Sequence, residues 1–541
     1  MRFEIRASRA ADFRISVGPP TPRGSAAQFY SDPAYAVAQM PGPETTPLPI
    51  KDATVTKFPR FGDSRGYFNE LYNETKYAEG ASPAERWKQV SFSKSGKHAL
   101  RGLHCSPHGK FITCVRGKFY DVIADFREES PTFGRWCGVM LSESNCKQVF
   151  VPARCGHGFF TLEDDTCALY LQEGCFDPSK EADTHPHDPL FGVAWPVPEG
   201  VAPLMSAKDT AAPPLAVRRP HLTGRAPRGR VLVIGASGQV GGALLEAFGP
   251  QNCVGTYSNT PIDGMVPFDM AAAAMNPALA DELMETVYPT VVCICAGFTW
   301  VDGCESQPLK ANQMNNAGPA AVAAAARKVG ARTVWYSTDY VFCGGVRQAK
   351  GPYNETDAPA PLNVYGSSKL GGEAAVLAAD PTALVLRTNV VYGPEKVGKN
   401  FVYQLVRKLK GGESMNVPED QVNTPTYNRD LADATKRLVD AGASGLFNAS
   451  GAEVLGRAAL ADAVLGALAA APAAGLPKLD TALVKPVTTS NAGQAALRPL
   501  ASGLTLTKLQ AAIPGWKPRS VGDAIADWVA NPMEGAKPLG E

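Results

Sequence analysis

The run Val231-Leu-Val-Ile-Gly-Ala-Ser-Gly-Gln-Val-Gly241 decides the fold of the larger part of this chain. Its four apolar residues predict a buried strand, its glycines predict a tight turn, and Ala243-Leu-Leu-Glu-Ala-Phe248 predicts the helix that follows. Glycines in such a turn let backbone amides approach a pyrophosphate at the positive end of a helix. An ordinary strand-to-helix turn is the alternative interpretation. The context favours a dinucleotide-binding domain that begins near residue 230.

The sequence on either side of this run predicts two domains. Residues 49–196 contain short β-branched and aromatic runs between turn residues, which predicts an all-β cupin or jelly roll. Residues 197–229, rich in Pro and Ala, are expected to be a linker, and residues 1–48 a flexible extension. Residues 230–541 predict a doubly wound parallel sheet of the Rossmann type, with a small substrate-binding lobe near the end. Its parallel strands are expected at 231–234, 291–295, 333–337 and 383–388.

The composition excludes several classes of protein. The 541 residues include 53 basic and 52 acidic side chains, so no charge excess points to a nucleic acid or a membrane surface. No apolar run is long enough to span a membrane. The twelve cysteines are scattered without paired CxxC spacing, which favours reduced thiols in a cytoplasmic protein. Glu4 and Asp12 argue against a targeting peptide.

The second half carries a pattern that is typical of hydride-transfer sites. Tyr365 and Lys369 are four residues apart, so on a helix they lie on one face. Bringing a tyrosine pKa from about 10 to near 7 requires about 4 kcal/mol of phenolate stabilisation, which a neighbouring lysine and a cofactor can supply. Thr338 ends an apolar strand, where its hydroxyl could bind a carbonyl or simply cap the chain. All seven histidines lie at or before His221, so this half works without imidazole.

These residues resemble the dTDP-4-dehydrorhamnose reductase family of extended short-chain dehydrogenases/reductases. The matching blocks are Ala296-Gly-Phe-Thr-Trp-Val-Asp-Gly-Cys-Glu305, Ser337-Thr-Asp-Tyr-Val-Phe342, Pro361-Leu-Asn-Val-Tyr-Gly366, Leu386-Arg-Thr388, Asp420-Gln421 and Pro425-Thr426. The resemblance implies that Tyr365 donates a proton, Lys369 tunes it and holds the ribose, and Thr338 orients the ketone. Nucleotide-sugar dehydratases place Glu after the Thr-Asp pair, so Tyr340 favours a reductase.

The resemblance also implies a nicotinamide cofactor and the residues that hold it. Ser258 and Asn259 follow the second strand, where an enzyme specific for NADH would carry an Asp or Glu, so NADPH is preferred and NADH is the alternative. The implied cofactor residues are Gly235, Ser237, Gly238, Gln239, Val240, Asp269, Ala296, Tyr365 and Lys369. Asn400 is expected to contact the substrate.

The first half gathers a different set of ionisable residues, among them His104, Lys110, His157, Tyr170 and Asp188. Several histidines in a β-barrel could bind a metal, but cupin metal sites generally use His-x-His, and His104 is separated from the next histidine by three residues. We therefore expect no metal. Buried core histidines are the other alternative for each histidine alone.

Residues 52–196 resemble the dTDP-4-dehydrorhamnose 3,5-epimerase family, a group of metal-free cupins. The matching blocks are Asp63-Ser-Arg-Gly-Tyr-Phe68 with Glu70, Arg101-Gly-Leu-His104, Gly117 through Arg127, Ser130-Pro-Thr-Phe-Gly134, His157-Gly-Phe159, Asp188-Pro189 and Ala194-Trp-Pro196. The resemblance implies that His104 is the base and Asp188 its partner, that Lys110 stabilises the enolate, and that Tyr170 returns a proton on the opposite face. It implies substrate contacts from Arg65, Glu70, Arg101 and His157.

The first half departs from the family pattern at three places. Cys105-Ser106 follow His104 where an aromatic residue and Gln are common, Leu171 replaces a usual Lys, and Phe176 replaces a Tyr. These differences bear on whether both C3 and C5 of the sugar are inverted or only one. The base and the acid remain.

Together the two resemblances imply consecutive reactions on a dTDP- or UDP-linked 4-keto-6-deoxyhexose. Epimerisation of nucleotide-4-keto-6-deoxyglucose followed by reduction at C4 would give nucleotide-L-rhamnose. Another 6-deoxyhexose is one alternative, and a regulatory or scaffold protein that retains both folds is another. Both families are commonly dimeric, so we expect a homodimer.

Overall fold

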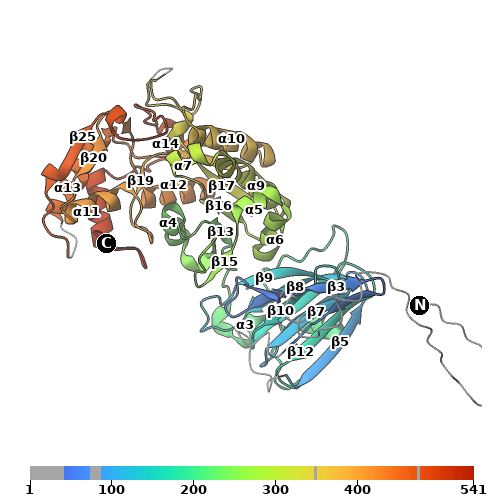
Figure 1. Cartoon of the computed structure of the whole chain (residues 1–541). Helices are drawn as coiled ribbons and strands as arrows, with labels where there is room; N and C mark the ends of the chain where they lie inside the picture. The colour runs from blue at the N-terminus through green and yellow to red at the C-terminus, as the bar shows by residue number, and fades with distance from the viewer. Residues whose placement is uncertain (1–41, 74–86, 347–349, 472–474) are drawn as a thin grey trace, which may run out of the picture.

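The computed structural model describes residues 42–73, 87–346, 350–471 and 475–541, which form two domains (Figure 1). The expected extension, residues 1–48, falls mostly outside the described residues. Its end differs from the expectation, because strand β1 (Glu44–Pro47) pairs antiparallel with β2 (Thr54–Lys57). Within the described ranges, no helix combines the length and apolar character needed to cross a membrane.

The first domain is a sandwich of two antiparallel sheets, as the sequence predicted. One sheet has the strand order β1-β2-β10-β7-β12-β5 and the other β6-β11-β8-β9, and a small hairpin, β3-β4, lies outside them. Ile112, Phe119, Val149 and Phe159 belong to the apolar core of this domain. The further strands are β3 (Arg60–Asp63), β4 (Gly66–Asn69), β5 (Gln89–Ser95), β6 (Leu100–Cys105), β7 (Lys110–Arg116), β8 (Lys118–Asp125), β9 (Trp136–Ser142), β10 (Lys147–Val151), β11 (Cys155–Thr161) and β12 (Thr166–Gln172).

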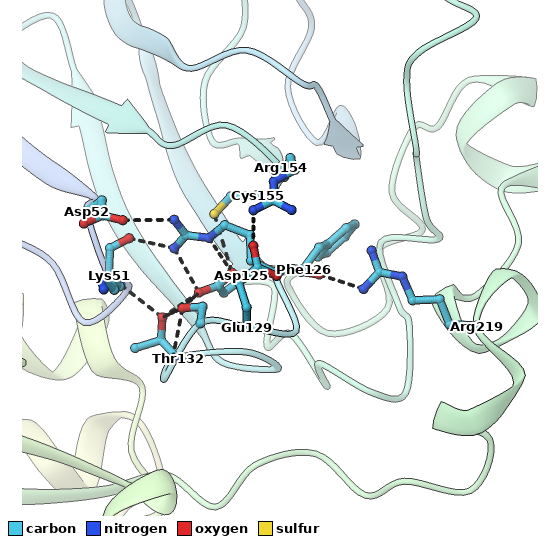
Figure 2. Close-up of polar contacts among 11 residues, drawn as sticks. Lys51, Asp52, Asp125, Phe126, Glu129, Thr132, Arg154, Cys155 and Arg219 are labelled. Carbon is cyan, nitrogen blue, oxygen red and sulfur yellow. Dashed lines mark hydrogen bonds and ion pairs between the residues drawn. The ribbon is translucent and has the colours of Figure 1, made fainter. Parts of the chain in front are cut away.

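A buried carboxylate organises the loops at one end of this sandwich (Figure 2). Asp125 accepts hydrogen bonds from Arg127, from Ser130 and, at 2.6 Å, from Thr132. Arg127 also donates to the carbonyl of Lys51, at 2.8 Å, so the cluster ties the loop before β2 to the loop after β8. A buried charge is tolerated when it is paired and hydrogen-bonded in this way. The two sequence blocks that carry these residues, Gly117 through Arg127 and Ser130 through Gly134, are therefore structural elements of the fold.

The segment 197–229, expected to be a linker, is largely part of the first domain. It forms α2 (Ala207–Ala211), α3 (Leu215–Arg218) and η3 (Pro220–Leu222). Leu215 and Leu222 are buried in the core beneath β6. Ser206 caps α2 by accepting a hydrogen bond from the Asp209 amide at 3.1 Å. The Pro- and Ala-rich composition gave no periodic pattern that would predict these short helices. One of them, α2, has a side-chain cap, and α3 and η3 each pack through a single leucine.

The second domain is built on a parallel seven-stranded sheet, with the order β15-β14-β13-β16-β17-β18-β23. Its strands are β13 (Val231–Ile234), β14 (Cys253–Tyr257), β15 (Met265–Pro267), β16 (Val291–Ile294), β17 (Arg332–Thr338), β18 (Leu384–Thr388) and β23 (Gly445–Asn448). All strands run in the same direction, but the order in which the chain adds them reverses at β13: β14 and β15 lie on one side of it and β16, β17 and β18 on the other. Doubly wound sheets bind ligands at the carboxyl ends of the strands at such a switch point. The predicted Rossmann fold is confirmed.

Helices cover both faces of this sheet. One face is covered by α4 (Gln239–Phe248), α12 (Asn428–Asp440) and α14 (Thr507–Ala512), which share one apolar core. A second core holds α5 (Met270–Met275), α6 (Ala278–Val287), α9 (Gly318–Lys328) and α10 (Val364–Ala379) on the other face. The segment α7 (Val301–Ser306), α8 (Pro308–Asn312) and η5 (Gln313–Ala317) leads into α9.

A smaller lobe follows the sheet, as expected, and lies beside it in Figure 1. Its core packs Tyr403, Val464 and Trp528 from three helices, α11 (Phe401–Lys410), α13 (Arg457–Ala470) and α15 (Val521–Ala530). Short strand pairs complete it: β19 (Val391–Tyr392) with β22 (Thr426–Tyr427), β20 (Met415–Pro418) with β25 (Val484–Val487), and β21 (Val422–Asn423) with β24 (Leu455–Gly456).

The two domains touch through β9 of the first and α6 of the second (Figure 1). The Tyr120 hydroxyl donates to the Glu285 carbonyl at 2.7 Å. The Arg230 guanidinium lies 4.4 Å from the centre of the Trp136 ring and 5.4 Å from that of Tyr288. The joining segment therefore carries specific contacts with both domains.

Candidate active sites

A cavity of about 370 Å³ lies between the two sheets of the first domain. The four-stranded sheet contributes His104 and His157, and the six-stranded sheet contributes Lys110 and Tyr170. With Arg101, which also lines the cavity, the structure brings together five residues predicted for the epimerase site. The other lining residues are Gln89, Ser91, Ser106, Gly158, Phe159, Gln172, Phe176, Glu181 and Lys208. Among the described residues, no group of three or more His, Cys, Asp or Glu could hold a metal ion.

The partner of His104 is Asp209, not Asp188. His104 Nε2 lies 2.8 Å from Asp209 Oδ1, and Asp209 is buried at the start of α2. Burial opposes ionisation of Asp209, but its interactions with His104, Ser206 and Lys208 together lower its pKa below the ordinary value. Such a pair fixes the tautomer of the imidazole and stabilises its charged form.

Asp188 has a structural role instead. One of its oxygens accepts a hydrogen bond from the Leu190 amide at 2.8 Å, and the other accepts from Thr184 Oγ1 at 2.8 Å and from the Leu215 amide at 2.6 Å. Asp188 therefore holds α3 against the sandwich. The prediction that it pairs with His104 is wrong, because its oxygens are directed at backbone and hydroxyl donors.

The cavity holds further polar residues whose charge is set by burial. Burial lowers the pKa of Lys110, although the charges of Glu181 and Asp121 oppose this. Burial also lowers the pKa of His157, whose Nε2 lies 2.7 Å from Asp121 Oδ1. The pKa of Tyr170 is raised by burial to about 12, so its phenol is protonated at neutral pH, and its hydroxyl lies 3.0 Å from that of Ser93. The site combines a base, a cation and a protonated phenol.

Two predicted substrate residues are not near this cavity. Arg65 lies on the exposed β3-β4 hairpin and pairs with Asp63 at 2.5 Å, and Glu70 accepts a hydrogen bond from Asn73 at 3.2 Å. Neither belongs to the cavity lining that the described residues form. Arg101 does belong to it, and its Nε donates to Ser95 Oγ at 3.0 Å.

Replacing each of the two carboxylates in turn separates their roles. Asp209→Asn is expected to slow proton exchange at the substrate carbon by on the order of 10²-fold, because His104 loses the group that orients it and stabilises its charge. Asp188→Asn should leave the exchange rate of folded protein near that of the wild type, but lower its stability by about 2 kcal/mol through weakened hydrogen bonds. Deuterium uptake measured beside thermal unfolding checks both. Equal loss of exchange in the two variants would contradict this assignment.

The glycine turn of the second domain has the geometry that a dinucleotide requires. Gly235 has a φ of +83°, and a Cβ there would lie 2.7 Å from the Ala296 amide nitrogen. A Cβ at Gly241 would lie 2.3 Å from the Gly235 carbonyl oxygen. Gly238 is the N-cap of α4, so no side chain blocks the positive end of that helix. The turn is therefore close-packed at two glycines, and its third glycine begins the helix, as in a turn that binds a pyrophosphate.

Thr338, Tyr365 and Lys369 meet at the carboxyl end of β17. Tyr365 is partly exposed, its hydroxyl forms a hydrogen bond with that of Thr338, and burial raises the pKa of its phenol. Thr338 Oγ1 in turn donates to Asp339 Oδ1 at 3.1 Å. Lys369 is buried, and burial lowers its pKa to about 7. Its Nζ donates to the Tyr336 carbonyl at 2.5 Å. The structure brings together the three residues, Thr338, Tyr365 and Lys369, that the sequence predicted for this site.

Two other predicted residues of this domain are helix caps. Asp269 accepts hydrogen bonds from the Ala271 and Ala272 amides at the start of α5. Asn400 caps α11 and also donates to the Gly393 carbonyl at 2.8 Å. Capping uses one oxygen of Asp269 and the only side-chain oxygen of Asn400. Contacts of Asp269 with the cofactor and of Asn400 with the substrate remain predictions.

Several residues of these sites were not predicted. Asp209 was missed because it lies in the supposed linker, although Ser206 three residues earlier is a capping signal. Asp121 and Asp339 each interrupt or end an apolar strand, which is itself a signal, because a buried carboxylate needs a partner. Asp339 accepts a hydrogen bond from Ser502 at 2.5 Å, and burial raises its pKa to about 6.

Comparison with known proteins identifies the two domains. Residues 47–217 match the family model described as dTDP-4-dehydrorhamnose 3,5-epimerase, and residues 229–532 match the RmlD substrate binding domain. The dTDP-4-dehydrorhamnose 3,5-epimerase of Salmonella typhimurium is 39% identical over 168 residues, covering 30% of this chain and 91% of that protein. The dTDP-4-dehydrorhamnose reductase of Mycobacterium tuberculosis is 39% identical over 260 residues, covering 48% of this chain and 81% of that protein.

A solved structure with a similar second domain is the dTDP-4-dehydrorhamnose reductase of Bacillus anthracis in complex with NADP. It is 30% identical, with a TM-score of 0.48, and covers 56% of this chain and 98% of its own. The predicted fusion is confirmed by the two family models. The chain belongs to the dTDP-4-dehydrorhamnose 3,5-epimerase family over residues 47–217 and to the dTDP-4-dehydrorhamnose reductase family over residues 229–532.

Proposed function

We propose that this chain catalyses two successive reactions on one sugar nucleotide. The first domain epimerises dTDP-4-keto-6-deoxyglucose at C3 and C5, and the second reduces the resulting ketone at C4 to give dTDP-L-rhamnose. The observation that carries the proposal is that both catalytic sets are complete in one chain. His104 with Asp209 faces a cavity shared with Lys110 and Tyr170, and Thr338, Tyr365 and Lys369 meet beside the glycine turn.

The first domain supplies a base and a means to stabilise the carbanion. A hydrogen next to a ketone is about 10 pKa units less acidic than an ordinary histidinium, a gap of ~14 kcal/mol, so a base alone is not sufficient. His104, oriented by Asp209, removes the proton, and Lys110 stabilises the enolate oxygen. Tyr170 lies on the opposite sheet from His104 and is protonated, so it can return a proton to the other face of the carbon.

The second domain protonates the ketone oxygen while the carbon is reduced. Thr338 orients the ketone, and Tyr365 donates its proton to O4. Lys369 stabilises the phenolate that forms and binds the ribose of the cofactor. NADPH, when bound with its pyrophosphate on the amides after Gly235, supplies the hydride. The glycines of the turn fit this cofactor, because a Cβ at Gly235 or Gly241 would clash with backbone atoms and the tight turn before α4 could not form.

Three alternatives differ in substrate or class. A UDP-linked substrate or another 6-deoxyhexose would use the same chemistry. A regulatory or scaffold protein would not require an accessible Tyr365, and its partial exposure favours an enzyme. Phe176 and Ser106 line the first cavity, so inversion of a single carbon is the further alternative for that domain.

The proposal is tested by following NADPH oxidation with dTDP- and UDP-4-keto-6-deoxyglucose. We expect oxidation with the dTDP substrate, and no oxidation with either substrate would contradict the reductase function. Ser258, which is exposed after β14, tests the cofactor preference. Ser258→Asp should favour NADH over NADPH by at least about tenfold relative to the wild type, because a carboxylate binds the free ribose 2′-hydroxyl and repels a 2′-phosphate. An unchanged ratio of kcat/KM values would contradict this placement.

A further inference from the structure

The helix α10 carries a third functional position beyond Tyr365 and Lys369. Glu373 follows Lys369 by four residues, so the three side chains lie along one face of the helix. Each of them meets one of three consecutive residues of β17. These contacts are Thr338 with Tyr365, Lys369 Nζ to the Tyr336 carbonyl at 2.5 Å, and Ser337 Oγ to Glu373 Oε1 at 2.6 Å.

Glu373 is also clamped from the neighbouring strand. Arg387 of β18 donates from Nε to Glu373 Oε1 at 2.8 Å and from Nη2 to Oε2 at 2.7 Å. The side chain of Glu373 is 7% exposed and that of Arg387 is 3% exposed, so both charges are buried as a pair. A two-pronged arginine–carboxylate pair fixes direction as well as distance. This pair therefore sets the position of α10 relative to both strands beneath the catalytic residues.

The charge of Glu373 acts on Lys369 as well. Burial lowers the pKa of Lys369 to about 7, and the charge of Glu373 opposes this shift. The groups around the ammonium are Glu373 and Tyr365 from α10, Cys295 after β16, the Tyr336 carbonyl and Trp335 ring from β17, and Arg387 from β18 behind Glu373. Glu373 is the first of the groups that favour the charged lysine.

We propose that Glu373, held by Arg387 and Ser337, is a positioning residue of the reductase site that fixes α10 on the sheet and favours the charged form of Lys369. This role rests on the proposed reductase function. It acts through Lys369 and Tyr365, and it needs no contact with substrate or cofactor. The pair is then an electrostatic support for the site as well as a structural one.

Removing the negative charge of Glu373 or the positive charge of Arg387 tests this role, because the two changes should shift the pH profile in opposite directions. Glu373→Gln removes the favourable charge and leaves Arg387 uncompensated, so we expect the alkaline limb of the kcat profile to move at least one pH unit toward acid and kcat at pH 7.5 to fall about tenfold. Arg387→Gln leaves the Glu373 charge without its counter-ion, so the limb should move toward higher pH. The pH dependence of NADPH affinity, measured by fluorescence titration, should shift in the same directions.

Three controls separate charge from folding. The variant Glu373→Gln/Arg387→Gln replaces both charges with amides, and it should fold if either single variant does not, with a limb at lower pH than the wild type. Asp430→Asn breaks another buried carboxylate–arginine pair, with Arg519, and should lower stability without moving the profile. Proton exchange by the first domain of the same molecules should stay unchanged.

The outcomes distinguish the two proposals. The role of Glu373 would be overturned if two profiles stay at the wild-type pH in both Glu373→Gln and the double variant, even if kcat falls. These profiles are the alkaline limb of kcat and the pH dependence of NADPH affinity. A wild-type chain that binds NADPH but oxidises none would contradict the proposed function, and the binding profiles would then still test Glu373.

Discussion

His104→Ala is expected to abolish deuterium uptake at the substrate's C3 and C5 and to leave the reductase intact. His104 is the imidazole that Asp209 orients in the first cavity, and alanine can accept no proton. A positioned general base contributes up to about 10⁴-fold, so the exchange rate should fall by that order. NMR of dTDP-4-keto-6-deoxyglucose incubated in D₂O without NADPH measures the rate.

The second domain of the same variant provides the control. His104→Ala should oxidise NADPH at the wild-type rate when it is given the ketone that already has the L-configuration, since the two sites share no side chain. His108→Ala changes the histidine four residues later, in the connection between β6 and β7, which is not among the described lining residues of the cavity, and this variant should exchange normally. Exchange by His104→Ala at more than a tenth of the wild-type rate would contradict the assignment of the base.

Tyr365→Phe should have the reverse effect. The phenol is the proton donor beside Thr338, and phenylalanine keeps the ring without the proton. We expect kcat for NADPH oxidation to fall on the order of 10³-fold, while deuterium exchange at C3 and C5 continues. The epimerised ketone should then accumulate, which NMR detects directly.

Tyr403→Phe is the matched control for this change. Its hydroxyl donates to the Lys537 carbonyl at 2.6 Å in the lobe core, so its loss should reduce stability and leave kcat within about twofold. Mixing Tyr365→Phe with His104→Ala should restore product, because each variant retains the reaction that the other has lost. Failure of the mixture, with both single activities present, would show that the intermediate does not pass between molecules.

Short-range patterns made much of the second domain predictable. The strand expected at 231–234 is β13, and the spacing of Tyr365 and Lys369 placed them on one face of α10. These features depend on residues near each other in sequence, where periodicity and turn chemistry act. The same holds for the alternating strands of the first domain.

Long-range pairing was less accessible. His104 and Asp209 are 105 positions apart, and a buried carboxylate does not reveal which donor it will meet. The family resemblance implied Asp188 as the partner, but its oxygens accept hydrogen bonds from Thr184 and two backbone amides. Only the packing of α2, which lies within the supposed linker, beside β6 separates the two.

The sequence shows where charged residues lie in apolar strands, but it does not show which residues pair with them. Asp121 lies within an apolar strand and Arg387 ends another, and each needs a partner from elsewhere in the fold. The sequence shows that such partners must exist. The structure is needed to show that they are His157 and Glu373.

The central claim is that both reactions act in turn on one sugar, and one measurement tests it most directly. The full chain is incubated with dTDP-4-keto-6-deoxyglucose and NADPH in D₂O, and the product is identified by NMR. We expect dTDP-L-rhamnose with deuterium at both C3 and C5. A reduced product without deuterium at either carbon, or an epimerised ketone that is never reduced, would contradict the claim.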